Sequence, residues 1–212
     1  MTDVMIITHL MGGMGNQMFQ YAAGKELAIR FNVPLKLDIS GFKWDPLRHY
    51  ALDCYNIEAQ IAEDDEIGMY KFSKIYSLCR AIPFLRNIIN YPRNDNNIWF
   101  REHCFQYNEN IQRCSENTYL EGYWQSERYF KKIEDIIRKD FTLKKELPPD
   151  LLDLARFLGE NNSVGIHVRR SDYISNPSTN ATHGTCSPEY YNKAINMMTE
   201  RLGDSGFTSY WL

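Results

Sequence analysis

The sequence predicts an α/β protein whose strands form a parallel sheet covered by helices. Three observations lead to this prediction. An apolar run at 4–11 precedes a helical pattern and a second apolar run at 35–39, a further strand-loop-helix order begins at Thr118, and a strand pattern at 163–170 precedes the last helix. Such alternation favours a parallel sheet, whose ligands bind beyond the carboxyl ends of the strands.

The opening of the chain is predicted to be a β-α-β unit. The run VMIITHLM at 4–11 has a branched apolar centre and ends at a glycine pair, as expected of a buried strand. From Gln17 apolar residues recur at helical spacing, and Asn32 with Val33-Pro34 ends this helix. The second strand is LKLDI at 35–39.

A second strand-loop-helix unit begins with TYLEGYW at 118–124, and Ser126 is expected to cap its helix. The apolar face of that helix consists of Phe130, Ile133, Ile136 and Ile137. Pro148-Pro149 marks the predicted boundary between a first domain at 1–148 and a second at 149–212. The elements expected in the second domain are a helix at 150–159, a strand at 163–170 and a helix at 188–202.

Composition and charge favour a globular protein that binds a small molecule or a glycan. The chain has 212 residues, 43% of them hydrophobic, and a formal net charge of -3, which argues against an overall nucleic-acid binder. Its five cysteines include no C-x-x-C pair and are expected to be reduced cytosolic thiols. Asp3 stands where a signal peptide needs a basic residue, and glycines interrupt the uncharged stretch 4–24, so a cytoplasmic location is expected.

The segment 67–94 contains five basic residues and no acidic residue, and Pro83 interrupts it. This pattern predicts a broken pair of basic amphipathic helices. Two interpretations stay open: a solvated helical face, or peripheral contact with anionic lipid at the inner face of the cell membrane.

The strand pattern SVGIHVRR at 163–170 ends in two arginines, and Asp172 follows. Alternation places His167 and Arg169 opposite the apolar residues, with Arg170 at the carboxyl end. Guanidinium groups bind phosphate oxygens bidentately, so a diphosphate is one natural counter-charge, with Asp172 orienting an arginine or a sugar hydroxyl. The other interpretation is an Arg-Asp ion pair that caps the strand.

The glycine-rich stretch GGMGNQ at 12–17 follows the first strand. A dinucleotide-binding G-x-G-x-x-G pattern fails because Met18 occupies its third glycine site, and a P-loop fails because Glu26 stands where Ser or Thr is needed. The stretch is then either a merely tight turn, or a turn where a ligand approaches bare backbone and hydrogen-bonds to Asn16 and Gln17.

Three segments, GGMGNQMFQYAAG, EGYWQSERYF and GIHVRRSDY in this order, resemble the bacterial α-1,2-fucosyltransferases of glycosyltransferase family 11. The resemblance runs from residue 4 to about residue 202. It implies that the H-x-R-R-x-D segment binds the GDP-fucose donor, through His167, Arg169, Arg170 and Asp172. It also places the glycine turn at a cleft facing the donor, and the candidates there are Gly13, Gly15, Asn16 and Gln17.

The implied fold is GT-B-like, with two facing Rossmann-like domains that each contain a parallel sheet. Residues 1–148 would form the acceptor-side domain and 149–212 the start of the GDP-fucose-binding domain. After ERLGD the family continues with a Phe-Ser-Asp-Asp type strand motif and a Ser-Phe-Ser-Trp-Trp segment, which this sequence lacks. We therefore expect an incomplete second domain and a C-terminally truncated member of the family.

The implied reaction transfers L-fucose from GDP-fucose to the 2-hydroxyl of a galactose in an acceptor glycan, with inversion. Arg169 would stabilise the departing diphosphate, Asp172 and His167 are both eligible as general base, and His9 is expected to be structural or solvated. No Asp-x-Asp motif occurs, so no metal or other cofactor is expected. The alternatives are an inactive remnant or glycan-binding fragment of the family, and a Rossmann-type nucleotide-binding oxidoreductase, which Met18 disfavours.

Overall fold

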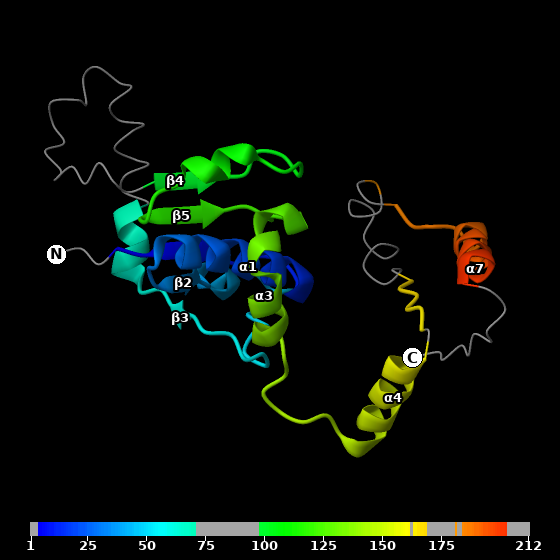
Figure 1. Cartoon of the computed structure of the whole chain (residues 1–212). Helices are drawn as coiled ribbons and strands as arrows, with labels where there is room; N and C mark the ends of the chain where they lie inside the picture. Colours follow the sequence, from blue (N-terminus) through cyan, green and yellow to red (C-terminus); the bar gives the residue numbers. More distant parts are fainter. Residues whose placement is uncertain (1–3, 71–97, 162, 169–180, 182–183, 203–212) are drawn as a thin grey trace, which may run out of the picture. The chain divides into compact units, whose positions relative to one another are not determined.

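The computed structural model of the chain describes residues 4–70, 98–161, 163–168, 181 and 184–202 (Figure 1). The chain divides into two compact units, Met1–Glu146 and Leu147–Leu212, which we call unit 1 and unit 2. Each unit is described by itself.

Unit 1 is built on a five-stranded sheet in the order β3-β2-β1-β5-β4, and all its neighbouring strands are parallel (Figure 1). The strands are β1 Ile6–His9, β2 Leu35–Asp38, β3 Gln60–Ile61, β4 Ile98–Arg101 and β5 Thr118–Glu121. The predicted α/β class with a parallel sheet is confirmed. The sequence patterns predicted β1, β2 and β5, whereas β3 and β4 were not predicted.

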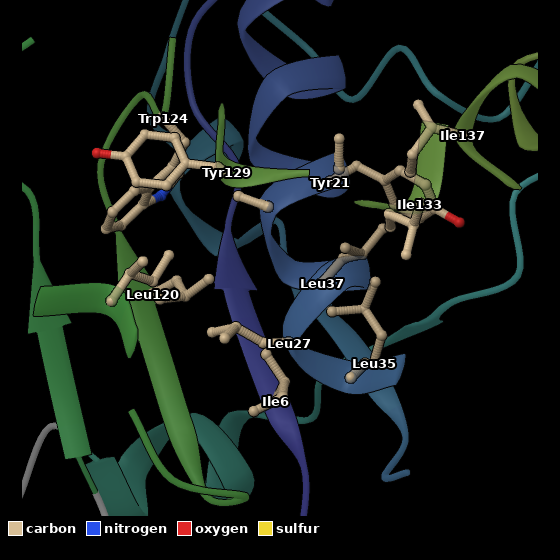
Figure 2. Close-up of a cluster of buried hydrophobic side chains, with 14 of the residues drawn as sticks. Ile6, Tyr21, Leu27, Leu35, Leu37, Leu120, Trp124, Tyr129, Ile133 and Ile137 are labelled. Atoms are coloured by element: carbon tan, nitrogen blue, oxygen red, sulfur yellow. The ribbon is translucent and has the colours of Figure 1, made fainter. Parts of the chain in front are cut away.

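Helix α1, Met14–Phe31, packs on one face of this sheet. Figure 2 shows Leu27 of this helix in a cluster of buried side chains with Ile6 and Leu37 of the strands. The helix ends at Asn32, as predicted, because Asn32 adopts a left-handed conformation with φ 55°. A β-α-β unit therefore opens the chain.

The other face of the sheet carries a second buried cluster. Ile7 and Tyr119 of the strands pack there with Ile67 and Tyr70, and residues 64–70 are helical. The Tyr70 hydroxyl donates to the carbonyl of Met5 at 3.3 Å. The start of the basic segment 67–94 is thus part of the core, and its residues 71–94 lie outside the described residues.

The region after β5 winds through short turns instead of one helix. These elements are the 3-10 turns η4 Glu127–Tyr129 and η5 Lys131–Ile133 and the helix α3 Glu134–Asp140. Ser126 caps η4, as predicted, by accepting a hydrogen bond from the backbone of Arg128. Ile133 and Ile137 are buried, whereas Ile136 is 40% exposed, so the predicted apolar face is only partly correct.

Unit 2 contains the helices α4, Pro149–Glu160, and α7, Pro188–Leu202, both close to their predicted bounds. The strand predicted at 163–170 is wrong for the described residues 163–168, which form no strand and are all exposed. A strand needs a neighbour to satisfy its backbone, and the described residues of unit 2 contain no strand that could pair with it. The second parallel sheet of a GT-B arrangement stays a prediction.

Candidate functional site

The carboxyl ends of the unit 1 strands meet at one edge of the sheet, where α/β proteins bind their ligands. β1 ends at His9, β2 at Asp38, β5 at Glu121 and β4 at Arg101. The loops that leave these ends carry the glycine turn and most of the EGYWQSERYF segment. This carboxyl edge is the candidate site.

The glycine turn combines one position with a left-handed backbone and two open positions. Gly12 has φ 74°, where any residue with a side chain would be strained, and a Cβ there would lie 2.6 Å from Asn16 Nδ2 and displace the end of that side chain. Gly13 is the N-cap of α1 and, as a glycine, has no side chain to cap the helix. A Cβ at Gly13 or Gly15 would meet nothing within 4 Å. The backbone at the start of α1 is therefore open to a ligand.

Gln17 is fully buried and holds this turn in place. Its Nε2 donates to the carbonyls of Gly12 at 3.0 Å and His49 at 2.8 Å, and its Oε1 accepts from the backbone N–H of Ala51 at 2.9 Å. Both amide protons are thus used within the protein. Gln17 was predicted to bind the donor, but its side chain here joins α1 to the loop after β2.

Asn16, a second predicted donor-binding residue, is half-buried and contacts the loop after β5. Its Oδ1 accepts a hydrogen bond of 2.7 Å from Nε2 of the exposed Gln125. β1 and β5 are neighbours in the sheet, so the loops that follow them are adjacent. This amide pair links the glycine turn to the EGYWQSERYF segment.

Glu102 shapes the loop that carries Gln125. Its Oε2 accepts hydrogen bonds from the backbone N–H groups of Tyr123 at 2.8 Å and Trp124 at 2.9 Å. Trp124 is fully buried (Figure 2) and has φ 55°, a rare conformation for a residue with a side chain. A buried indole and a carboxylate clamp thus hold a strained backbone at the edge of the sheet.

Asp38 and Tyr119 form a buried pair at the same edge. The Tyr119 hydroxyl donates to Asp38 Oδ2 at 2.6 Å, and the backbone of Ser40 donates to Oδ1 at 2.8 Å. Burial raises the pKa of Asp38, but the hydrogen bonds from Ser40 and Tyr119 and the nearby His9 outweigh it, so the pKa is lowered overall. His9 stacks on the Tyr119 ring at 6.4 Å, which fits its predicted structural role.

The remaining predicted site residues belong to unit 2. His167 is exposed, while Arg169, Arg170 and Asp172 lie outside the described residues. Within the described ranges, no group of three His, Cys, Asp or Glu side chains has an arrangement that could hold a metal ion. None of the helices in those ranges is long and apolar enough to span a membrane.

Sequence reasoning missed the roles of Gln125, Glu102 and the Asp38–Tyr119 pair. Gln125 follows a predicted strand, and this position was the available signal. Asp38 likewise lies at a predicted strand end, but its partner Tyr119 is distant in sequence. Glu102 follows β4, which was not predicted, so no sequence signal placed it at the edge.

Fold and site together define an α/β protein of the kind that binds ligands at the carboxyl edge of a parallel sheet. The model of Glycosyl transferase family 11 matches residues 91–208. An alpha-1,2-colitosyltransferase of Escherichia coli is 32% identical over 204 residues, which cover 95% of this chain and 67% of the relative. The O-antigen biosynthesis glycosyltransferase WbnK of Escherichia coli is 30% identical over 209 residues, covering 92% and 68%.

The chain belongs to Glycosyl transferase family 11. It is a glycosyltransferase related to enzymes that transfer colitose or build O-antigen, and it spans about two thirds of the length of these two relatives. The oxidoreductase alternative is therefore wrong. No solved structure matches the chain significantly.

Proposed function

We propose that this chain is an inverting glycosyltransferase that transfers L-fucose from GDP-fucose to the 2-hydroxyl of a galactose in an acceptor glycan. The observation that carries the proposal is the H-x-R-R-x-D segment at 167–172, which lies within the stretch that the family model matches. Two adjacent guanidinium groups suit the two phosphates of the donor, and their charge would stabilise the departing diphosphate.

In this proposal each predicted residue has a task. Arg169 and Arg170 bind the diphosphate, and Asp172 or His167 accepts the proton of the attacking hydroxyl. The open glycines at the start of α1 leave room for the donor sugar nucleotide, and Asn16 offers it a neutral amide. Gln17 acts by holding the glycine turn in shape.

Arg169→Ala tests the diphosphate role. We expect this variant to lose detectable GDP binding in isothermal titration calorimetry while its far-UV spectrum stays unchanged. Arg169→Lys should not restore binding, because lysine supplies the charge without the bidentate geometry. Arg156→Ala is the matched control, since Arg156 lies on α4 and pairs with Asp153. Wild-type affinity in Arg169→Lys would contradict the proposed role.

We further propose that transfer needs no metal ion, since the two arginines supply the positive charge that a divalent cation supplies elsewhere. Product formation should persist in excess EDTA. Loss of product in EDTA that manganese or magnesium restores would contradict this part of the proposal.

The donor sugar is the second point to test. One relative is named a colitosyltransferase, and colitose is L-fucose without its 3-hydroxyl group. We propose fucose as the donor sugar, so kcat/KM should be higher with GDP-fucose than with the matching colitosyl donor. The opposite ranking would assign the chain to colitose transfer and leave the glycosyltransferase mechanism intact.

A glycan-binding protein without transfer activity is the second candidate function. The observation that favours it is the exposed, irregular backbone at 163–168, which leads into the two arginines. Incubation with GDP-fucose and a galactoside distinguishes the two candidates: release of GDP with a fucosylated product supports the enzyme, and glycan binding without product supports the alternative. The lipid contact expected of 67–94 also stays a prediction, which binding to anionic vesicles would test.

A further inference from the structure

Two aromatic side chains of unit 1 are largely exposed to solvent instead of packing in its core. Trp44 is 88% exposed and Phe105 is 69% exposed. In the part of unit 1 that the structure describes, no other aromatic residue is classed as exposed. Trp44 follows β2 through the turn η1, Ser40–Lys43, and Phe105 follows β4, so both lie in loops of the carboxyl edge.

The loop that carries Trp44 is held by hydrogen bonds before and after this residue, and the first runs from the backbone N–H of Trp44 to the carbonyl of Gly41 at 3.3 Å. Asp45 Oδ1 accepts from the backbone of Leu47 at 2.9 Å and of Arg48 at 3.1 Å, which forms a tight turn. The buried amide of Gln17 then fixes the end of the loop through the carbonyl of His49. Trp44 is thus presented to solvent from an anchored backbone.

Phe105 is anchored in a comparable way at the other end of the edge. Its ring lies 5.9 Å from that of Tyr123, with 33° between the ring planes. The backbone of Tyr123 is bound by Glu102, the carboxylate that also fixes Trp124. The exposed ring therefore packs on a loop with a fixed shape.

Between the two aromatic positions lies the amide pair of Asn16 and Gln125. One proton of Gln125 Nε2 bonds to Asn16, which leaves Gln125 a second amide proton and a carbonyl oxygen. A sugar hydroxyl both donates and accepts, so an exposed neutral amide matches it. The pair carries no charge that would call for a charged ligand.

The sheet order fixes the sequence of these groups along the edge. Trp44 follows β2, Asn16 follows β1, Gln125 follows β5 and Phe105 follows β4, and these four strands are consecutive in the sheet. Three strand spacings amount to about 14 Å, which is longer than one sugar ring and close to a chain of about three. An aromatic side chain, two amides and a second aromatic side chain thus follow one another along the edge. This arrangement suits an extended ligand.

We propose that the carboxyl edge of unit 1 binds the acceptor as an oligosaccharide of about three sugar rings, with Gln125 hydrogen-bonded to a central ring and Trp44 and Phe105 stacked against the outer ones. The C–H face of a sugar ring suits the negative face of an aromatic ring, and its hydroxyl groups suit the amides. This inference rests on the proposed function and deepens it, because it names the acceptor class and the residues that select its length.

A lipid surface would also suit Trp44 with Lys43 and Arg48. It gives no role to Phe105 or to the Gln125 amide, which a sugar chain explains together with Trp44. The oligosaccharide is therefore the favoured occupant, and vesicle binding is an arm of the test.

The test measures the affinity of the full chain for methyl galactoside and for linear galactose-terminated oligosaccharides of two, three and four sugars. For the wild type we expect affinity to rise with length up to three sugars, by about tenfold in total, and then to level off. Trp44→Ala and Phe105→Ala should each remove about half of this rise and leave methyl galactoside binding unchanged. Gln125→Ala should weaken binding at every length.

The control is Ile29→Ala, since Ile29 is 41% exposed near the end of α1 that lies away from the carboxyl edge. Thermal unfolding should be the same for all four variants. An affinity that does not depend on length, no measurable binding of any galactoside, or a rise that survives both aromatic substitutions would overturn the inference. So would loss of binding to anionic vesicles in Trp44→Ala with unchanged glycan affinity.

Failure of the inference can be told apart from failure of the proposed function. If GDP-fucose is consumed and both aromatic variants keep the wild-type KM for a trisaccharide, the enzyme assignment stands and the inference fails. If no product forms but trisaccharide binding depends on Trp44 and Phe105, the inference stands and the transfer activity fails.

Discussion

Units 1 and 2 both contain helices, but only in unit 1 do the described helices have a sheet to pack on. Nine residues of α1 are buried, whereas α4 has no buried residue. The apolar residues of α4 include Leu152, 41% exposed, and Phe157, 38% exposed. The difference teaches that local sequence is enough to form a helix, while burial needs a partner surface that the helix does not itself supply.

The largest expected effect of this difference is on local stability. We predict that backbone amides of α4 and α7 exchange with solvent at a free energy of opening at least about 3 kcal/mol below that of β1, β2 and α1. The reason is that few apolar contacts oppose opening in unit 2. Native-state hydrogen exchange measures both sets in one sample. Equal protection of the two units in a monomer would break the comparison.

A matched pair of leucine substitutions tests the same contrast through side chains. Leu27→Ala removes a side chain that is fully buried between α1 and the sheet, and it should lower the free energy of unfolding by about 3 kcal/mol. Leu152→Ala, on the exposed helix α4, should change it by less than about 0.5 kcal/mol. Urea unfolding of both variants gives the values. A comparable loss in the two would show that α4 is covered in solution.

The contrast also explains how far the sequence could be interpreted. Both helices of unit 2 were predicted because capping and periodicity are local: Ser187 accepts a hydrogen bond from the backbone of Tyr190 at 3.4 Å at the start of α7. The strand at 163–168 was predicted from the same kind of local pattern, and it failed because a strand depends on neighbours. β3, only two residues long, exists because Leu37 and Lys36 of β2 pair with it.

The candidate site shows the same limit. The turn at Gly12 and the loop after β5 could be recognised as motifs in the sequence, because short stretches so rich in glycine or in aromatic residues are unusual. Whether an amide faces solvent or the protein was not visible, because Gln17 and Gln125 are the same residue type and each follows a strand at a short distance. Contacts from residues such as His49 and Ala51 decide this, and they are distant in sequence.

A smaller effect is expected from removing the amide that joins α1 to the loop after β2. Gln17→Ala leaves the backbone groups of Gly12, His49 and Ala51 without this partner, which should lower the free energy of unfolding of unit 1 by about 2 kcal/mol. Gln125→Ala is the control, since the same residue type there is exposed. Urea unfolding should show a loss for Gln17→Ala alone. Equal losses of unfolding free energy in the two variants would contradict the structural difference between the buried amide of Gln17 and the exposed amide of Gln125.

The smallest effect concerns the buried pair of Asp38 and Tyr119. The described residues of unit 2 contain no buried pair of this kind. The Tyr119 hydroxyl is one of the groups that lower the pKa of Asp38 in the folded protein. A carboxylate whose pKa is lowered by folding stabilises the fold above its unfolded pKa of about 4, and this contribution is lost as the pH falls through the folded value.

Tyr119→Phe should therefore raise the pKa of Asp38 and lower the free energy of unfolding at pH 7 by about 1 kcal/mol. The difference from the wild type should shrink as the pH falls through the folded-state pKa values of Asp38, because the carboxylate is protonated first in the variant and then, at lower pH, in the wild type. Urea unfolding at pH 7 and pH 3, with an NMR titration of the Asp38 carboxyl carbon, measures both quantities. Tyr123→Phe is the control, since Tyr123 packs on Phe105 at the same edge. A difference that persists unchanged at pH 3 would assign the effect to packing of the ring instead of to the charge of Asp38.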